Sequence, residues 1–259
     1  MLASADSDVF VAVGQNGAIL RSTNNGASWD NETCQVFTNL NAVGYGNNTF
    51  VAVGATGRII RSTNNASSWE NSTSGTTINF NGVTYGNGNF VAVGNNRNVY
   101  SSTDGSSSSW TRRSYYNWSS YYHLYGAAYG NSTFVAVGNR FIGRSTNASS
   151  WSFSNAPYLR DRNHMAVTYG GGSTFVGVGQ YGKIIRSTNS GSSWDNMTTG
   201  YSPYTAPSGS LYLNGVAYGN STFVAVGQSG TILTSTDGAN WTTRTSGTTN
   251  ALYGVSFGE

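Results

Sequence analysis

One five-residue phrase, an aromatic residue followed by small apolar residues and a glycine, recurs six times along this chain of 259 residues. The copies lie at Phe10–Gly14, Phe50–Gly54, Phe90–Gly94, Phe134–Gly138, Phe175–Gly179 and Phe223–Gly227. Successive copies are 40 to 48 residues apart. A period of this length with strand-like content is typical of β-propellers, in which each repeat forms one four-stranded blade. The spacing therefore predicts an all-β fold, a six-bladed β-propeller with four antiparallel strands per blade.

The last complete repeat gives the expected strands of one blade. Residues 213–219, 222–227, 231–235 and 240–245 read as its four strands in order. Glycine and asparagine stand at the junctions, where tight turns need positive φ. The second strand is apolar on both faces, which is typical of a strand buried between neighbouring blades.

The two ends of the chain suggest how such a ring closes. Residues 252–258 repeat the first-strand phrase of 213–219, whereas the first repeat begins at its second strand, near Val9. We therefore expect the C-terminal strand to complete the N-terminal blade and to close the ring, which would remove an open sheet edge. The repeats follow one another without a linker, so a single domain is expected over residues 1–259.

Residues 1–8 precede the first repeat. The small residues Ala3, Ser4 and Ala5 before Asp6 fit the pattern of a signal-peptidase site. We expect this segment to be flexible or a signal remnant, and the protein to be extracellular or at the cell surface.

A recurring turn precedes the fourth strand of each repeat. Segments 22–29 and 187–194 both read Ser-Thr-Asn-x-Gly-x-Ser-Trp. This pattern resembles the Asp-box, or BNR, repeat of sialidase-like and photosystem II assembly-factor-like propellers. The resemblance implies a structural role for the turn, in which the Asx side chain closes the turn and the Trp packs beneath it. The box tryptophans are Trp29, Trp69, Trp110, Trp151, Trp194 and Trp241.

Only 9% of the residues are charged, against about 25% in an average globular protein. The surface must therefore be built from Asn, Ser, Thr, Gly and Tyr, and little charge repulsion opposes association. The arginines are scattered, which argues against a nucleic-acid partner. No apolar run is long enough for a membrane span. Cys34 is the single cysteine, and it is either an unreactive residue or an intermolecular bridge.

Three consecutive connections between repeats are longer than the others and rich in Tyr, Trp and Arg. They leave the fourth strand of one blade for the first strand of the next, so they are expected on one face of the ring. Such residues are enriched at binding hot spots. The candidate binding or assembly surface comprises Arg112, Arg113, Tyr115, Tyr116, Trp118, Tyr121, Tyr122, Tyr158, Arg160, Arg162, Tyr201, Tyr204 and Tyr212.

The sequence offers little for catalysis. Its glutamates are Glu32, Glu70 and Glu259, and no tyrosine is placed to form the Tyr–Glu pair that a sialidase-like activity would require. Glycoside hydrolysis needs two carboxyl groups in one site, and the ten acids are scattered. His123 and His164 lie near the starts of two first strands, but a metal site needs at least three ligands. We therefore expect no enzyme, no metal and no cofactor.

Ten Asn-x-Ser/Thr sequons occur, and several recur at equivalent turns where glycans would be exposed. The candidate N-glycosylation sites are Asn31, Asn47, Asn65, Asn71, Asn117, Asn131, Asn147, Asn196, Asn220 and Asn240.

Three functions remain open from the sequence. The first is a secreted, non-catalytic structural or adhesive building block that is N-glycosylated and assembles with itself into a fibre or surface layer. The second is a lectin whose aromatic loops stack on a glycan. The third, which the family resemblance implies, is an assembly-factor-like scaffold that binds other proteins.

Overall fold

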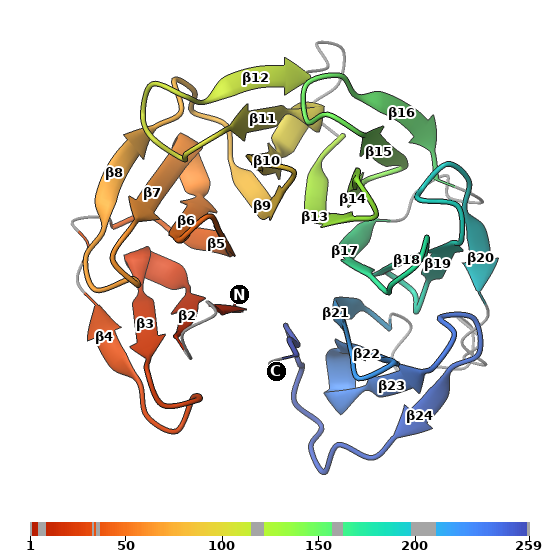
Figure 1. The fold of residues 1–259 in the computed structure, drawn as a ribbon. Helices are drawn as coiled ribbons and strands as arrows, with labels where there is room; N and C mark the ends of the chain where they lie inside the picture. The colour runs from red at the N-terminus through yellow and green to blue at the C-terminus, as the bar shows by residue number, and fades with distance from the viewer. Residues whose placement is uncertain are drawn as a thin grey trace. The chain divides into compact units, whose positions relative to one another are not determined.

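The computed structural model describes residues 2–4, 9–32, 34, 37–114, 122–156, 163–197 and 211–257. The described chain forms six four-stranded antiparallel sheets, and in each sheet strands adjacent in sequence lie side by side (Figure 1). The residues group into two compact units, 1–124 with 147–151, and 125–146 with 152–259. The predicted all-β fold with four-stranded antiparallel repeats is confirmed.

The first unit contains three sheets. The first sheet consists of β1 (Leu2–Ser4), β2 (Phe10–Val13), β3 (Ile19–Ser22) and β4 (Asp30–Glu32). The second consists of β5 (Leu40–Gly46), β6 (Thr49–Gly54), β7 (Arg58–Ser62) and β8 (Glu70–Thr73). The third consists of β9 (Phe80–Gly86), β10 (Asn89–Gly94), β11 (Val99–Ser102) and β12 (Thr111–Ser114).

The other three sheets follow. The fourth consists of β13 (Leu124–Gly130), β14 (Thr133–Gly138), β15 (Phe141–Ser145) and β16 (Ser152–Asn155). The fifth consists of β17 (His164–Tyr169), β18 (Phe175–Gly179), β19 (Ile184–Ser187) and β20 (Asp195–Met197). The sixth consists of β21 (Leu213–Gly219), β22 (Thr222–Gly227), β23 (Ile232–Ser235) and β24 (Thr242–Arg244), close to the boundaries expected from sequence.

The second strand of each sheet carries the core. In β6 and β14 every residue is buried, which explains why these strands are apolar on both faces. A first-strand tyrosine covers the second-strand phenylalanine in five sheets, with ring centroids 4.5 to 5.2 Å apart. Such aromatic pairs add about 0.5–1.5 kcal/mol beyond the burial of their area. The recurring phrase is therefore a core signature, repeated once per sheet.

Tight turns join the second and third strands. In four sheets this turn is a single 3-10 turn: η1 (Gln15–Gly17), η2 (Ala55–Gly57), η3 (Asn95–Arg97) and η4 (Gln228–Gly230). The middle residue of each has left-handed backbone, with φ between 54° and 57°. In these four sheets the turn lies at the end of the sheet opposite to the turn between the first and second strands.

The edge of the first sheet differs from the sequence-based expectation. Its first strand is β1, which pairs with β2 in the register Leu2↔Ala12 to Ser4↔Phe10. The prediction that the C-terminal segment fills this place is therefore wrong. Because β1 lies close to β2 in the sequence, the loop-closure entropy lost on pairing the two strands is small. Of the segment expected to be flexible or a signal remnant, residues 1 and 5–8 lie outside the described residues.

The C-terminal segment instead lies along β21. The Leu252 backbone N–H donates to the Gly227 carbonyl at 2.9 Å, and the Asn214 side-chain amide donates to the Leu252 carbonyl at 2.9 Å. The same side-chain bond joins the second and third sheets, from Asn41 to the Phe80 carbonyl at 2.7 Å. Residues 251–257 thus pack like a first strand, as their sequence suggests, although they form no strand ladder.

Candidate binding surfaces

Each sheet has two chemically different ends, because its four strands run antiparallel. One end carries the turn between the second and third strands together with the connection to the next sheet; we call it the loop end. The opposite end carries the turn between the first and second strands and the tryptophan-containing turn; we call it the box end.

Two described members of the predicted aromatic surface, Tyr122 and Tyr212, lie at loop ends. The Tyr122 carbonyl accepts a hydrogen bond from the Arg97 N–H in η3 at 2.6 Å, so this long connection returns to the loop end of the third sheet. In the fifth sheet, the Gly182 N–H donates to the Leu211 carbonyl at 2.7 Å, and the rings of Tyr181 and Tyr212 lie 6.2 Å apart. The described parts of two long connections are therefore anchored on turns at the loop ends.

Two other members of that surface are among the described residues. Arg112 and Arg113 are exposed on β12, where the Arg113 Nε donates to the Ser101 hydroxyl at 2.8 Å. The following predicted residues lie outside the described chain: Tyr115, Tyr116, Trp118, Tyr121, Tyr158, Arg160, Arg162, Tyr201 and Tyr204.

His123 has a structural role at a loop end. Its Nδ1 accepts a hydrogen bond from the Asn96 N–H at 3.3 Å, so Nδ1 carries no proton. The side chains of Asn39 and Asn79 accept the equivalent N–H groups in the first two sheets, at 3.0 and 2.9 Å. Burial lowers the pKa of His123, because a charged imidazole loses hydration there. His123 thus takes the acceptor role that Asn39 and Asn79 have in the first two sheets.

His164 is the more unusual histidine. It is fully buried at the start of β17, where four other sheets place Leu40, Phe80, Leu124 and Leu213. Neither ring nitrogen has a hydrogen-bond partner, and the backbone of Gly138 lies near the ring. Burial lowers the pKa of His164 to about 4, and the Lys183 charge acts in the same direction.

No metal site is found in the described part of the chain, which contains no group of three or more His, Cys, Asp and Glu side chains able to hold an ion. Glu70 forms an ion pair with Arg61, with 2.5 Å between Glu70 Oε1 and Arg61 Nη1. Glu32 ends β4, opposite Ile19, and Glu259 lies outside the described residues. The Cys34 thiol is half-buried and lies 3.6 Å from the Gly17 carbonyl.

The box turns are held by their own side chains. In the third sheet the Asp104 carboxylate accepts the Ser106 N–H at 3.0 Å, and the Ser102 hydroxyl accepts the Gly105 N–H at 2.6 Å. Hydrogen bonds from Ser109 and Ser106 lower the pKa of Asp104 to about 2. The Trp110 indole closes the turn from below by donating to the Gly105 carbonyl at 3.1 Å.

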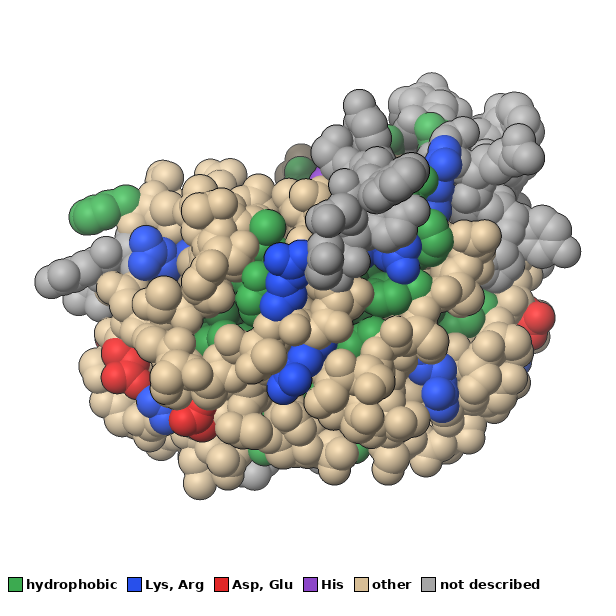
Figure 2. All heavy atoms as spheres, turned by 90° about the horizontal axis from the view of Figure 1, so that it is seen from above, with side chains coloured by type: hydrophobic (Ala, Val, Ile, Leu, Met, Phe, Trp, Pro, Cys, Tyr) green, Lys and Arg blue, Asp and Glu red, His purple; other side chains and the backbone are tan. Residues whose placement is uncertain are grey.

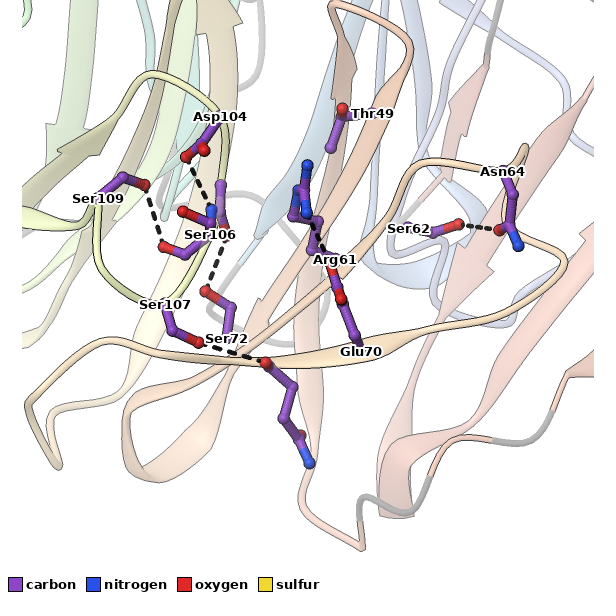
Figure 3. Close-up of polar contacts among 12 residues, drawn as sticks. Thr49, Arg61, Ser62, Asn64, Glu70, Ser72, Asp104, Ser106, Ser107 and Ser109 are labelled. Atoms are coloured by element: carbon purple, nitrogen blue, oxygen red, sulfur yellow. Dashed lines mark hydrogen bonds and ion pairs between the residues drawn. The ribbon is translucent and has the colours of Figure 1, made fainter.

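These turns also join neighbouring sheets, as Figure 3 shows for the second and third sheets. The buried Ser72 hydroxyl donates to the Gly105 carbonyl at 2.8 Å, and the Thr73 N–H donates to the Ser107 hydroxyl at 3.0 Å. A Cβ on Gly105 would lie 2.8 Å from the Val51 methyl group, so no side chain fits at this contact. The box turn is therefore an inter-sheet joint, a structural role like the one that the sequence resemblance implies.

Nine of the ten sequons lie at box ends or in the fourth strands that follow the box turns. Asn47, Asn131 and Asn220 occupy the turn between first and second strands, and Asn65, Asn147 and Asn240 occupy box turns. Asn31, Asn71 and Asn196 belong to β4, β8 and β20. Asn117 lies outside the described residues.

On the face drawn in Figure 2, the coloured basic and acidic side chains are spread among uncharged ones. No helix in the described residues is long and apolar enough to cross a membrane.

Comparison with known proteins supports the fold. No family model matches the sequence, and no curated protein matches it significantly. Among solved structures, YCF48 bound to D1 peptide is similar with a TM-score of 0.69 and 19% identity, over 94% of this chain and 79% of that one. YCF48 from Cyanidioschyzon merolae gives a TM-score of 0.68 at 14% identity, over 94% and 83% of the chains. The WD40 repeats of RRP9 give 0.73 at 9% identity, over 97% and 81%. The fold is thus that of the β-propellers.

Proposed function

We propose that this protein is a non-catalytic β-propeller scaffold that binds segments of other proteins at the loop ends of its sheets. Of the three functions left open by the sequence, this is the assembly-factor-like one. The observation that carries it is the anchoring of long, aromatic connections on loop-end turns, at Tyr122 and at Leu211. Tryptophan, tyrosine and arginine side chains are enriched among the few residues that dominate the binding free energy of protein interfaces.

The similar structures support the same class of function. One of them, YCF48, is bound to a peptide. We extend peptide or protein binding to this chain as part of the proposal, because the shared feature is the fold and the site itself must be tested here.

The test compares the two ends of the fifth sheet. Tyr181→Ala with Tyr212→Ala removes the aromatic pair at the loop end, and Thr188→Ala changes an exposed residue of the box turn in the same sheet. The unchanged protein and the two variants are each immobilised. The partner proteins that bind to them are then cross-linked and quantified by mass spectrometry. A partner retained by the Thr188 variant and lost with the tyrosine variant supports the proposal. No partner that depends on the tyrosines would refute it.

The arrangement of the sheets is part of this proposal. We infer that the six four-stranded sheets are the blades of one six-bladed propeller and that the box turns are Asp-boxes. Scattering in solution would test the ring, because a six-bladed ring and two separately moving units differ in radius of gyration.

A second candidate is the self-assembling building block. Residues Tyr253 and Phe257 of the C-terminal segment are 79% and 47% exposed, and a surface with so little charge resists association weakly. Electron microscopy with mass measurement tests this function: ordered fibres or sheets support it, and single particles exclude it. The extracellular location, the glycans and the lectin function stay predictions, and a glycan-binding screen tests the last of these.

A further inference from the structure

Two cavities of nearly equal size occupy the same place in the second and sixth sheets. One, of about 600 Å³, is lined by residues 56–58 and 71–77. The other, of about 580 Å³, is lined by residues 229–231 and 243–249. Each lies between the turn joining the second and third strands and the loop that follows the fourth strand. Both cavities are therefore at loop ends.

The two cavities are built from one sequence. Residues 73–77 and 245–249 both read Thr-Ser-Gly-Thr-Thr. In each loop the serine hydroxyl accepts the N–H of the residue two positions later, at 3.4 Å in Ser74–Thr76 and 3.3 Å in Ser246–Thr248. The loops are thus matched in conformation as well as in composition.

Each cavity contains one arginine, contributed from a different position. Arg58 begins β7 and pairs with Thr73, whereas its counterpart in the sixth sheet is Thr231. Arg244 ends β24 and pairs with Ile232, where the second sheet has Ser72 opposite Ile59. The cavities therefore share a guanidinium although the arginine itself is not at an equivalent position.

Among the residues that the structure describes, neither guanidinium group has a carboxylate partner. Arg58 donates from Nη1 to the Asn71 side chain at 3.1 Å, and its buried Nε has no partner. Arg244 donates from Nε to the Thr234 hydroxyl at 2.8 Å. Neither cavity is lined by an acidic residue, and the ion pair found among the described residues is that of Arg61 with Glu70. Hydroxyl donors and an uncompensated positive charge make both cavities suited to an oxyanion.

We propose that these two cavities bind carboxylate side chains of an acidic segment in a partner protein. Both cavities are open to solvent, so a side chain of a partner can enter them. A guanidinium binds a carboxylate by charge-assisted hydrogen bonds. This inference rests on the proposed function, since it names the partner chemistry of a scaffold that binds at loop ends.

The probe is a fluorescent peptide of sequence Gly-Ser-Glu-Asp-Glu-Ser-Gly, and its matched control replaces the acids by Gln and Asn. The protein is produced in bacteria, so that Asn71 in the first cavity carries no glycan. Binding is followed by anisotropy, and calorimetry gives the number of sites. We expect two equivalent sites for the acidic peptide and at least about 10-fold weaker binding of the amide peptide, because charge-assisted hydrogen bonds are the stronger ones.

Three variants locate the sites. Arg58→Gln and Arg244→Gln should each reduce the stoichiometry from two sites to one, and the double variant should bind at least about 10-fold more weakly at both. Arg21→Gln removes the same charge beside a box turn, where the Arg21 Nε donates to the Asn65 carbonyl. This control should keep both sites, and thermal melting verifies that all variants are folded.

The outcomes separate this inference from the proposed function. Equal binding of the two peptides, or unchanged stoichiometry in the double variant, overturns the carboxylate sites. If a partner that depends on Tyr181 and Tyr212 is nevertheless captured, the scaffold function stands without them. If both experiments fail, the scaffold function fails as well.

Discussion

The Arg144 guanidinium donates its Nε hydrogen to the Ser190 carbonyl at 2.8 Å, so an arginine on β15 holds the box turn of the fifth sheet. The first two sheets repeat this relationship, where Arg21 donates to the Asn65 carbonyl at 2.7 Å. Arg21 and Arg144 thus satisfy turn carbonyls of the following sheet.

Arg144→Met should lower the free energy of unfolding by about 1–3 kcal/mol, because it leaves the Ser190 carbonyl without its charged donor. Arg186 is the matched control, since its buried Nε has no partner. We expect Arg186→Met to change stability by less than about 0.5 kcal/mol or to increase it. Urea unfolding of both variants checks this, and equal losses would contradict the assigned role of Arg144.

Gly105→Ala should destabilise the protein more than Gly88→Ala. Both glycines have left-handed backbone, with φ of 75° and 72°. A left-handed alanine costs about 1–2 kcal/mol at either position. At Gly105 the new Cβ would also lie 2.8 Å from the Val51 methyl group, whereas at Gly88 nothing lies within 4 Å. The difference between the two melting temperatures measures how much the close contact with Val51 adds to the destabilisation. Identical melting temperatures would show that the structure accommodates the new Cβ at Gly105 without cost.

Acid should destabilise the fold through His164. The pKa of His164 falls from 6.5 to about 4 on folding, so below pH 6.5 the unfolded chain binds a proton that the folded chain does not. The part of the folding stability that depends on a neutral His164 is fully present above pH 6.5 and is lost as the pH falls towards 4. The pKa change corresponds to a loss of about 3 kcal/mol.

His164→Leu, which restores the residue type of β5, β13 and β21, should remove that pH dependence. Stability from denaturant unfolding between pH 7 and 4 is the measurement, with His123→Asn as the control at a repeat-like position. A wild-type curve parallel to that of His164→Leu across this range would show that His164 is hydrated in the folded state.

Passage through a eukaryotic secretory pathway should glycosylate the turn sequons unequally. Asn47 and Asn131 stand at equivalent turns and are both exposed, but the Asn131 amide nitrogen donates to the Ser190 hydroxyl at 2.8 Å and to Ser173 at 3.3 Å. A glycan on that nitrogen must displace these contacts. Peptide mapping after enzymatic deglycosylation in heavy-oxygen water should find higher occupancy at Asn47 than at Asn131, and the reverse order would contradict this reasoning.

The sequence predicts the sheets well because each repeat contains its own local signals. The apolar second strand is recognisable in Phe50–Gly54 because burial on both faces leaves no polar position. The box turn is recognisable because its side chains bond within eight residues. Both signals come from residues close together in the sequence, so they can be recognised without any knowledge of the neighbouring sheets.

The edges and the sites are harder to predict. Residues 2–4 lack the first-strand phrase, yet they pair with β2, since backbone hydrogen bonds require no particular side chains. The two cavities were missed although the repeated Thr-Ser-Gly-Thr-Thr was visible. Their arginines come from non-equivalent positions, so comparison of repeats alone does not align Arg58 with Arg244. His123 could have been assigned by alignment with Asn39 and Asn79.

The box-turn joint has a consequence for how such a chain can grow. In three joints a valine of one repeat contacts a turn glycine of the next: Val51 with Gly105, Val135 with Gly191 and Val176 with Gly238. The fifth repeat brings both parts, Val176 for one side and the Gly191 turn for the other. A duplicated gene segment of that repeat's length would therefore encode a part that already fits two neighbours, which makes the number of repeats an easily varied trait of this architecture.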